Sequence, residues 1–378
     1  GDYTNSAKEY QKIENPEELV SKFNDFLLMH NATYTNKAMN LVFFKDAIDH
    51  LSRIIRILRT PRGNALLIGV GGSGRQSLTR LAAYIRGYEA TQIELTRNYK
   101  EPQFKDDLKK LLKKAGAKNT PTVFIFSDTQ IVKETFLEDI NNILNTGEVP
   151  NLWAREDLEE INNEVRQAAK EAGRPEYQHF VSCVRENLHI VLAFSPVGSK
   201  LRERCLQFPS IINCCTIDWY DRWPTEALYS VAEKEYKSQN QLGIGEYVEA
   251  LSTLSVEIHT DIIEYSEKFY NELKRKNYTT PTSYLELLKL YIEMLKVQQN
   301  VLPMKMLKFS ISRIKVELPT LLQYLFQEES TNLTKILSSI SRQEMSQDPV
   351  TQSVLLKMVT VPVSNSSPKW TNFLLMML

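Results

Sequence analysis

The strongest chemical signal in this sequence is a glycine-rich segment at residues 69–77. It reads Gly-Val-Gly-Gly-Ser-Gly-Arg-Gln-Ser. Glycines let a backbone turn with its amide groups pointing inward, and the N-terminus of a following helix adds partial positive charge. Such a loop can cradle phosphate oxygens, so the segment predicts a phosphate site. The residues expected to contact a nucleotide here are Gly69, Gly71, Gly72, Ser73, Gly74, Arg75, Gln76 and Ser77.

This loop departs from the usual P-loop pattern at two positions. Arg75 stands where a lysine is expected, and Gln76 stands where the Mg²⁺-binding serine or threonine is expected. Ser77 comes one residue late, which on a helix is a rotation of roughly 100° away from the metal. Arg75 can still neutralise phosphate charge, although its planar fork is larger than an ammonium group. We therefore expect nucleotide binding to survive better than catalysis.

A second candidate for metal binding and catalysis follows the apolar run 123–126. P-loop ATPases place an Asp on Mg²⁺ near the end of this strand, and AAA+ members place a water-activating Glu next to it. Here Ser127 and Asp128 occupy those positions. Asp128 either replaces the Glu with a shorter side chain or, in a shifted register, serves the metal, and one acidic function is missing in both cases. Ser77 and Asp128 are the candidate Mg²⁺ ligands.

Hydrophobic spacing places the loop between a strand and a helix. Residues 64–69 are typical of a short buried strand, and residues 76–84 resume a helical pattern. Upstream, apolar residues between positions 36 and 58 recur at steps of three and four, which predicts a helix. The flanking elements therefore support the phosphate-site interpretation beyond a bare motif match.

The rest of the pattern predicts an α/β domain followed by a helical unit. Continuous apolar runs at 122–126 and 188–194 suit strands that are covered on both faces, as in a parallel sheet. Charged helical stretches at 105–115 and 155–172 lie between these runs, which gives a βαβα order. From residue 226 to about 299 no strong strand signal occurs, so this segment predicts a separate helical unit.

Composition limits the function classes. A chain of 378 residues exceeds what one compact core usually holds, so two or three units are expected. Lys plus Arg equals Asp plus Glu at 46 each, so the overall charge favours neither a nucleic-acid partner nor a membrane partner. The four cysteines lack the paired spacing of a zinc site, which favours reduced thiols. The first residue is Gly rather than Met, and we expect a piece of a longer chain.

Five segments of this sequence resemble the fourth AAA+ module of a dynein heavy chain. The segments are 69–78, 128–131, 136–152, 194–198 and 208–220. The resemblance extends from about Asn40 to Met294. The Arg-Gln pair in the phosphate loop and the missing acid after residue 126 are similar to the axonemal branch of the family.

The resemblance implies a fold and a division of the chain. The fold class is an α/β P-loop AAA+ large subdomain with a parallel sheet, followed by a small all-α lid subdomain, as one of six modules in a motor ring. The implied parts are an N-terminal connecting segment at 1–35, the large subdomain at 36–224, the lid at 225–298, and a divergent tail at 299–378.

The resemblance also implies roles for residues outside the loop. Nucleotide would lie between the loop, the hydrophobic segment near Leu41 and Val42, and the lid. Ser195, at the end of the run 188–194, falls where many AAA+ proteins carry a polar sensor. Arg202 and Arg204 are the candidates for an arginine finger that acts on the nucleotide of a neighbouring module.

The implied function is a regulatory module that binds ATP or ADP, with Mg²⁺ as a candidate cofactor, and hydrolyses slowly or not at all. It would serve microtubule-based ciliary movement, in the cytoplasm, cytoskeleton and cilium axoneme. Its partners would be neighbouring AAA+ modules and, indirectly, dynein intermediate and light chains. Pro303 and Pro319 interrupt the helical pattern where a stalk coiled coil should follow, so we expect no direct microtubule contact.

Two alternatives to a regulatory module remain open at the level of sequence. The chain could be a stand-alone AAA+ ATPase that forms a ring and supplies Arg202 or Arg204 across each interface. It could also be a nucleotide-free scaffold whose phosphate cradle is vestigial. The acid lost after Phe126 disfavours the first alternative.

Overall fold

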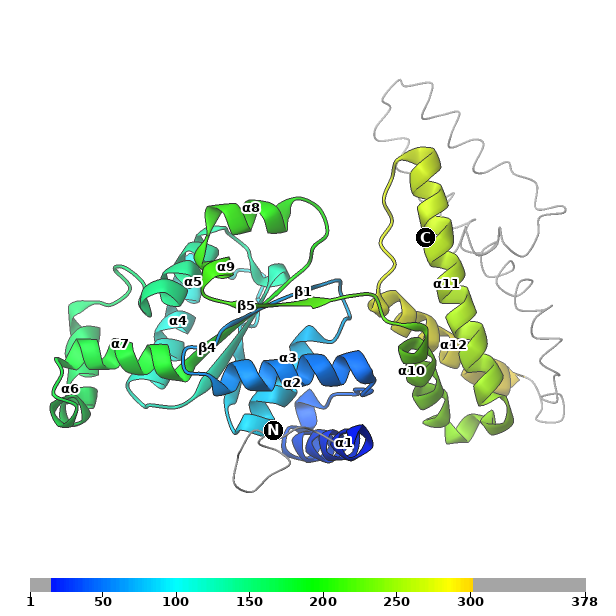
Figure 1. The fold of residues 1–378 in the computed structure, drawn as a ribbon, viewed down its shortest axis with the longest axis horizontal. Helices are drawn as coiled ribbons and strands as arrows, with labels where there is room; N and C mark the ends of the chain where they lie inside the picture. The colour runs from blue at the N-terminus through cyan, green and yellow to red at the C-terminus, as the bar shows by residue number, and fades with distance from the viewer. Residues whose placement is uncertain (1–14, 302–378) are drawn as a thin grey trace. The chain divides into compact units, whose positions relative to one another are not determined.

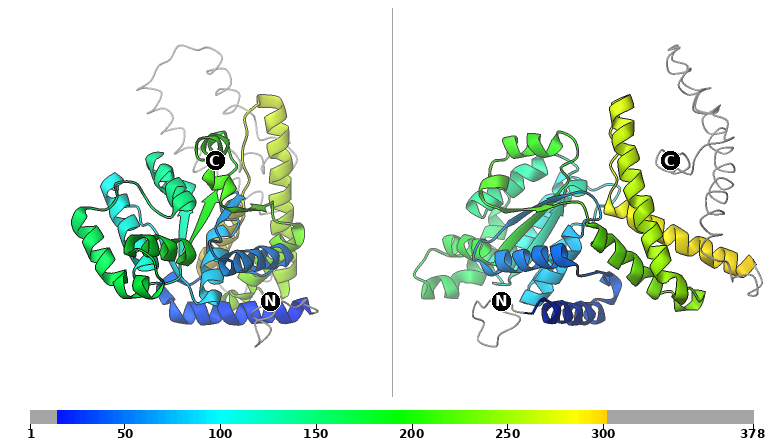
Figure 2. Two further views of the ribbon diagram at one scale, coloured as in Figure 1. Left: turned by 60° about the vertical axis from the view of Figure 1, so that its left-hand side comes forward. Right: turned by 45° about the vertical axis from the view of Figure 1, so that its right-hand side comes forward.

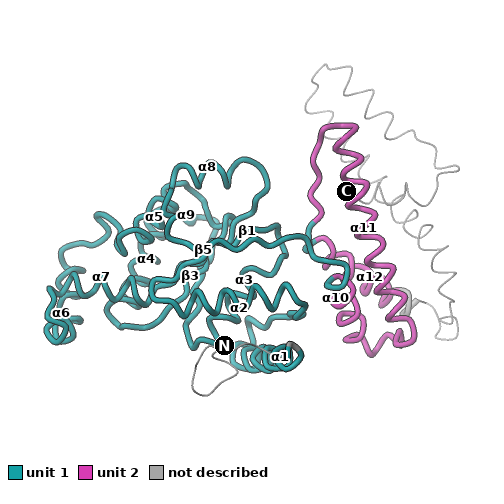
Figure 3. The backbone as a smooth tube through the Cα atoms, viewed as in Figure 1, with its two compact units in different colours: residues 1–227, 280–282 teal, residues 228–279, 283–378 magenta. Residues whose placement is uncertain are grey.

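A computed structural model describes residues 15–301 of the chain. The chain divides into two compact units, which Figure 3 shows in different colours. Unit 1 comprises residues 1–227 and 280–282, and unit 2 comprises residues 228–279 and 283–378. The predictions made for residues 1–14 and for the tail from 302 onward, including those for Pro303 and Pro319, lie outside the described residues.

Unit 1 is built on a five-stranded parallel sheet with the strand order β2-β3-β4-β1-β5. The strands are β1 (Ala65–Gly69), β2 (Glu89–Gln92), β3 (Thr122–Ser127), β4 (Leu188–Phe194) and β5 (Thr216–Tyr220). The three inner strands are buried along their whole length, as their continuous apolar runs predict. The sheet confirms the predicted α/β class with parallel strands.

Helices cover both faces of the sheet (Figures 1 and 2). The helices on one face are α1 (Pro16–Thr33), α2 (Lys45–Arg59) and α3 (Arg75–Arg86). Those on the other are α4 (Glu101–Gly116), α5 (Thr135–Thr146), α6 (Arg155–Glu171) and α7 (Glu176–Asn187). Alternate residues of one strand serve the two cores: Ala65 and Leu67 pack with α1–α3, whereas Leu66 and Ile68 pack with α4–α7.

Shorter elements complete unit 1. Helices α8 (Lys200–Gln207) and α9 (Ser210–Asn213) lie between β4 and β5, and 3₁₀ turns occur at Thr35–Lys37 and Asp128–Gln130. The predicted helix start at residue 36 is wrong, because α2 begins at Lys45. The Asn31 side chain donates to the carbonyl of Met39 at 2.8 Å and accepts from its amide at 2.9 Å. These bonds use backbone groups that a helix through Met39 would need.

Helices make up the secondary structure of unit 2 within the described part of the chain. They are α10 (Thr225–Lys237), α11 (Val248–Leu273) and α12 (Pro281–Val301), with 3₁₀ turns at Asn240–Leu242 and Gly245–Tyr247. Tyr284 is fully buried, and its hydroxyl donates to the carbonyl of Leu228 at 2.9 Å. A helical unit after the α/β unit was the expectation. None of the helices between residues 15 and 301 is long and apolar enough to cross a bilayer.

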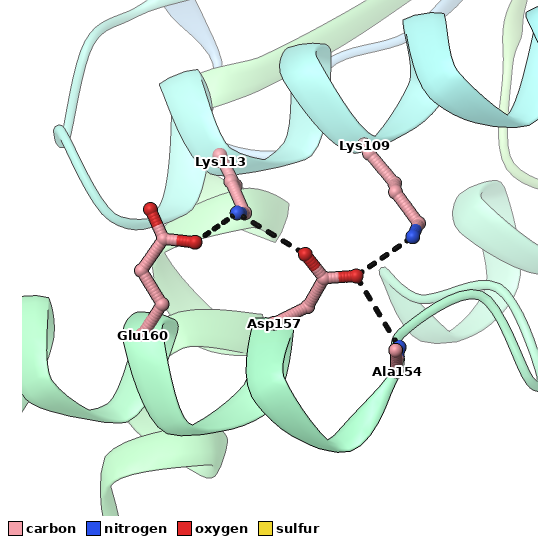
Figure 4. A network of polar contacts seen from close by, with 5 residues as sticks. All are labelled: Lys109, Lys113, Ala154, Asp157 and Glu160. Atoms are coloured by element: carbon pink, nitrogen blue, oxygen red, sulfur yellow. Dashed lines mark hydrogen bonds and ion pairs between the residues drawn. The ribbon is translucent and has the colours of Figure 1, made fainter.

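A charged network ties α6 to α4 (Figure 4). Asp157 accepts from Lys109 at 2.7 Å and from Lys113 at 3.5 Å, and Lys113 also pairs with Glu160 at 2.6 Å. The backbone amide of Ala154 donates to Asp157 at 3.3 Å, which caps the first turn of α6. The hydrogen bond from Lys109 lowers the pKa of Asp157 below its ordinary value. The network therefore fixes the α6 N-terminus against α4.

Candidate nucleotide site

The phosphate loop turns from the end of β1 into the start of α3. Gly72 and Gly74 have φ angles of 78° and 90°, which lie in the left-handed region that favours glycine. Gly74 is the N-cap of α3, and the Leu78 amide donates to its carbonyl at 2.8 Å. The predicted strand, loop and helix are thus adjacent, with the first amides of α3 at the loop.

Two buried hydroxyls at this loop have no hydrogen-bond partner within the described residues. They are the Oγ of Ser73 and the phenol oxygen of Tyr220, whose residues are 6% and 7% exposed. Tyr220 packs directly on the strand end, since a Cβ added at Gly69 would lie 2.7 Å from that of Tyr220. An unsatisfied buried hydroxyl is costly, so both groups suit a polar ligand. The loop therefore fits a bound phosphate compound.

A cavity of about 190 Å³ opens beside the loop. Its walls include Ser73 and Leu78 of the loop region, Phe44 and Ala47 at the start of α2, and residues 219–223 after β5. The aromatic wall suits a planar ring. No local pattern in the sequence predicts this wall, because the three segments meet only in the folded chain.

Leu41 and Val42, which the resemblance implied as nucleotide contacts, lie in the extended segment just before this cavity. Leu41 packs against the core formed by α1–α3. The cavity wall on this side begins at Phe44.

Arg75 is buried under the loop and faces the protein. Its residue is 9% exposed, and its guanidinium donates to the Phe194 carbonyl at 2.5 Å and to the Val70 carbonyl at 3.2 Å. Burial lowers the pKa of Arg75, and the nearby Asp128 opposes this effect. Arginine nevertheless stays charged at neutral pH. Arg75 therefore braces the loop against β4 and keeps a positive charge beneath it.

Glutamines occupy the side of the loop where the metal ligands of a P-loop site are expected. Gln76 accepts from the Gln92 side-chain amide at 3.2 Å, and Gln92 also donates to Gln130 at 3.4 Å. Arg80 of α3 donates to the side-chain oxygen of Gln92. Gln130 is 5% exposed and donates to the Ile93 carbonyl at 2.6 Å. The result is an amide network that joins α3, β2 and the end of β3.

Asp128 and Ser195 meet at the ends of neighbouring strands. The Ser195 backbone amide donates to the Asp128 carboxylate at 2.8 Å, across 67 residues of sequence. The Ser195 hydroxyl accepts from the Val197 amide at 3.3 Å. The structure thus brings Asp128, the candidate acid after β3, and Ser195, the candidate sensor, into direct contact. It places both beside β3 and β4 at the carboxyl edge of the sheet.

The two candidate finger arginines on α8 differ in their surroundings. Arg204 makes a forked ion pair with Glu134, at 2.9 Å for the shortest distance, and lies over the Phe194 ring. Arg202 is exposed on the same helix. No sequence motif points to Glu134, which precedes α5 and lies 70 residues from Arg204.

A buried acid on β5 was also missed. Asp218, which is 4% exposed, accepts from Arg53 at 2.7 Å and forms a 2.7 Å bond with the His50 ring. The hydrogen bond with Asp218 raises the pKa of Arg53. His50 stacks on Tyr220 with ring centroids 3.8 Å apart. This group fixes α2 to β5 and so fixes the wall of the cavity beside the loop.

The segment 280–282, which belongs to unit 1, covers the tip of the loop. A Cβ added at Gly72 would lie 2.5 Å from the backbone nitrogen of Thr282 and 3.0 Å from its Cα. One added at Gly71 would lie 3.5 Å from the Thr282 hydroxyl. The glycines therefore permit a close approach by Thr282.

The parallel sheet, the loop between β1 and α3 and the helical unit that follows define a P-loop AAA+ fold. The sequence profile of the family described as "P-loop containing dynein motor region D4" matches residues 39–294. The chain belongs to this family. The prediction of a dynein heavy-chain AAA+ module is confirmed, and region D4 is compatible with the predicted fourth module.

Several axonemal heavy chains are similar to this chain. Human "Dynein axonemal heavy chain 6" is 51% identical over 297 residues, which cover 77% of this chain and 7% of that protein. The Chlamydomonas reinhardtii "Dynein-1-beta heavy chain, flagellar inner arm I1 complex" is 49% identical over 72% of this chain and 6% of its own length. Mouse "Dynein axonemal heavy chain 2" is 42% identical over 334 residues, which cover 85% of this chain and 8% of that protein. The chain thus spans less than a tenth of these relatives.

Proposed function

We propose that this chain is a regulatory AAA+ module of an axonemal dynein motor ring that binds ATP or ADP and hydrolyses slowly or not at all. The observation that carries the proposal is the pair of buried, unpartnered hydroxyls of Ser73 and Tyr220 at the phosphate loop. The cavity beside the loop provides room for a base or sugar. The missing second acid after β3 is the reason to expect slow hydrolysis.

The setting of the module follows from its relatives. Those relatives are axonemal heavy chains, so we place this module in the cytoplasm, in the cytoskeleton of a cilium axoneme, where it contributes to microtubule-based movement. Its direct partners are the neighbouring modules of the same ring. Intermediate and light chains of dynein are indirect partners.

Arg202 is the better candidate for the arginine finger. A finger must extend toward a neighbouring module and must be free to contact a phosphate. Arg202 is exposed on α8, whereas Arg204 is held by Glu134. We therefore assign Arg204 to holding α8 against the segment before α5, and Arg202 to the contact in trans.

Isothermal titration of the chain with ADP and with ATP tests nucleotide binding. We expect saturable binding at micromolar to millimolar nucleotide and phosphate release slower than about 1 s⁻¹, at the low end of enzyme turnover. Absence of binding at millimolar nucleotide would contradict the proposal. Release at 1 s⁻¹ or faster would contradict slow hydrolysis alone.

The variant Gly71→Glu tests whether the nucleotide binds at the phosphate loop. Gly71 does not have a positive φ, and an added Cβ meets only the Thr282 hydroxyl, at 3.5 Å. The new carboxylate would repel phosphate, so we expect at least tenfold weaker binding with an unchanged melting temperature. Arg155→Glu, an exposed change of charge on α6, is the matched control and should bind as the parent does.

A further inference from the structure

We propose that the phosphate loop binds its nucleotide without a divalent cation. This inference rests on the proposed nucleotide binding and concerns the place that Mg²⁺ takes in a P-loop site. In such sites a serine or threonine after the loop lysine and an aspartate at the end of the next strand hold the metal. The residues at those places in this chain do not fit that role.

The first ligand position is an amide already engaged with the protein. Gln76 follows Arg75, and its side-chain oxygen accepts from Gln92 at 3.2 Å. The oxygen of Gln92 in turn accepts from the Arg80 guanidinium. Mg²⁺ needs oxygen ligands in near-ideal octahedral geometry. A metal would have to take these oxygens from partners that hold them in other directions.

The second ligand position is occupied in the same way. Ser127 ends β3 and is 2% exposed, and both its backbone amide and its hydroxyl donate to the Gln130 oxygen, at 2.9 and 3.1 Å. The Gln130 nitrogen donates to the Ile93 carbonyl at 2.6 Å. Ser127 also bonds the Thr129 hydroxyl at 2.8 Å. A neutral hydroxyl in this network replaces the carboxylate that binds the metal elsewhere.

The local charge points the same way. Two arginines, Arg75 and Arg80, lie at this side of the loop, and burial lowers the pKa of both while they remain cationic. The acid beside them, Asp128, accepts the backbone amide of Ser195 at 2.8 Å. Fixed guanidinium charges attract a phosphate and repel a dication. The arginines thus supply the charge that Mg²⁺ supplies in other P-loop sites.

Ser77 and Asp128, the metal ligands predicted from sequence, do not change this conclusion. Ser77 lies one helical position past the metal-binding place, and one of the two Asp128 carboxylate oxygens accepts the amide of Ser195, the residue after β4. The amide network and the two arginines therefore make this a site for nucleotide alone.

Titration of the full chain with ADP and with ATP, in matched ionic strength with MgCl₂ or with EDTA, tests the inference. We expect the two Kd values for each nucleotide to agree within threefold. A larger gain in affinity from Mg²⁺ overturns the inference and leaves nucleotide binding intact. Absence of binding in both buffers overturns the proposed function itself, so the two failures are distinguishable.

The double variant Gln76→Thr/Ser127→Asp tests whether these two positions are the cause. It restores a hydroxyl and a carboxylate at the metal-binding places, so Mg²⁺ should tighten its binding of ATP at least tenfold. Circular dichroism first establishes that the variant is folded. A folded variant without this gain overturns the assignment, and Mn²⁺ spectroscopy of the parent provides a second readout. Nucleotide-dependent Mn²⁺ binding by the parent chain would overturn the inference even if the variant does not fold.

Discussion

Arg75 shows how one substitution can keep part of a P-loop's function and change the rest. A lysine ammonium is a compact point charge, whereas a guanidinium is a planar fork with five donors. The fork of Arg75 spans two backbone carbonyls, of Phe194 and Val70, at 2.5 and 3.2 Å. The loop is therefore braced by the protein itself, before any nucleotide arrives, and its positive charge stays beneath the phosphate position.

Gly72 is a second position where a single residue type decides the local structure. Gly72→Ala should destabilise the chain by more than about 1–2 kcal/mol, the cost of a left-handed conformation, because the methyl would also overlap Thr282. Gly173→Ala is the matched control, since Gly173 has a φ of 64° and open space around its Cβ position. Chemical unfolding measures both. Equal losses would show that the approach of Thr282 is unimportant.

The α8 arginines give a prediction that separates structure from function. Arg204→Ala should lower the free energy of unfolding by roughly 0.5–1 kcal/mol, because it breaks a partly exposed ion pair with Glu134. Arg202→Ala should leave stability unchanged within about 0.5 kcal/mol. In an intact heavy chain, Arg202→Ala should instead slow ATP turnover in the neighbouring module. Full turnover in that variant would refute the finger assignment.

At the scale of elements, the ion network between α4 and α6 makes a pH-dependent prediction. The pKa of Asp157 is lowered in the folded chain, so its contribution to stability is present above the unfolded pKa and is lost as pH falls through the folded pKa. Asp157→Asn should therefore cost roughly 0.5–1 kcal/mol at pH 7, and this cost should shrink as pH falls below the ordinary Asp pKa of about 3.9. Urea unfolding across this range provides the measurement.

Asp106→Asn is the control for this pH series. Asp106 is an exposed acid on α4, and its replacement should change stability by less than about 0.5 kcal/mol at every pH. If Asp157→Asn were equally neutral at pH 7, the network of Figure 4 would contribute nothing measurable to the joint between α4 and α6.

The whole chain offers a prediction about where nucleotide acts. Segment 280–282 belongs to unit 1 and lies on the tip of the phosphate loop, while the rest of α12 belongs to unit 2. ADP should therefore slow hydrogen exchange in residues 69–78 and also in residues 280–282, because a ligand stabilises the contacts that surround it. Exchange mass spectrometry with and without ADP measures this. Hydrogen exchange in peptides from α6 should not change. Protection confined to residues 69–78 would contradict the expectation that nucleotide also stabilises residues 280–282.

Sequence patterns alone located the inner strands and the loop. The runs at 64–69, 122–126 and 188–194 are apolar because both faces of these strands are covered, so a local pattern is enough to reveal them. The predicted start of α2 was too early. Two hydrogen bonds between the Asn31 side chain and the Met39 backbone keep the chain non-helical there, and hydrophobic periodicity does not predict such bonds. The edge strand β5 was not predicted from hydrophobic spacing, because its exposed and buried residues do not form a continuous apolar run. Its residues entered only as part of segment 208–220, which carries the family resemblance.

The sequence by itself determined the family, the phosphate loop and the loss of an acid after β3, because these depend on residue type and local spacing. The tertiary structure decided what those residues contact. Arg75 meets the Phe194 carbonyl across 119 residues, and Asp218 meets His50 across 168. The amide network around Gln92 joins three elements that are adjacent only in the sheet. Such partners are set by strand order and register, which bring distant segments together, so only the folded chain shows that Gln76 and Ser127 are already hydrogen-bonded to neighbouring side chains.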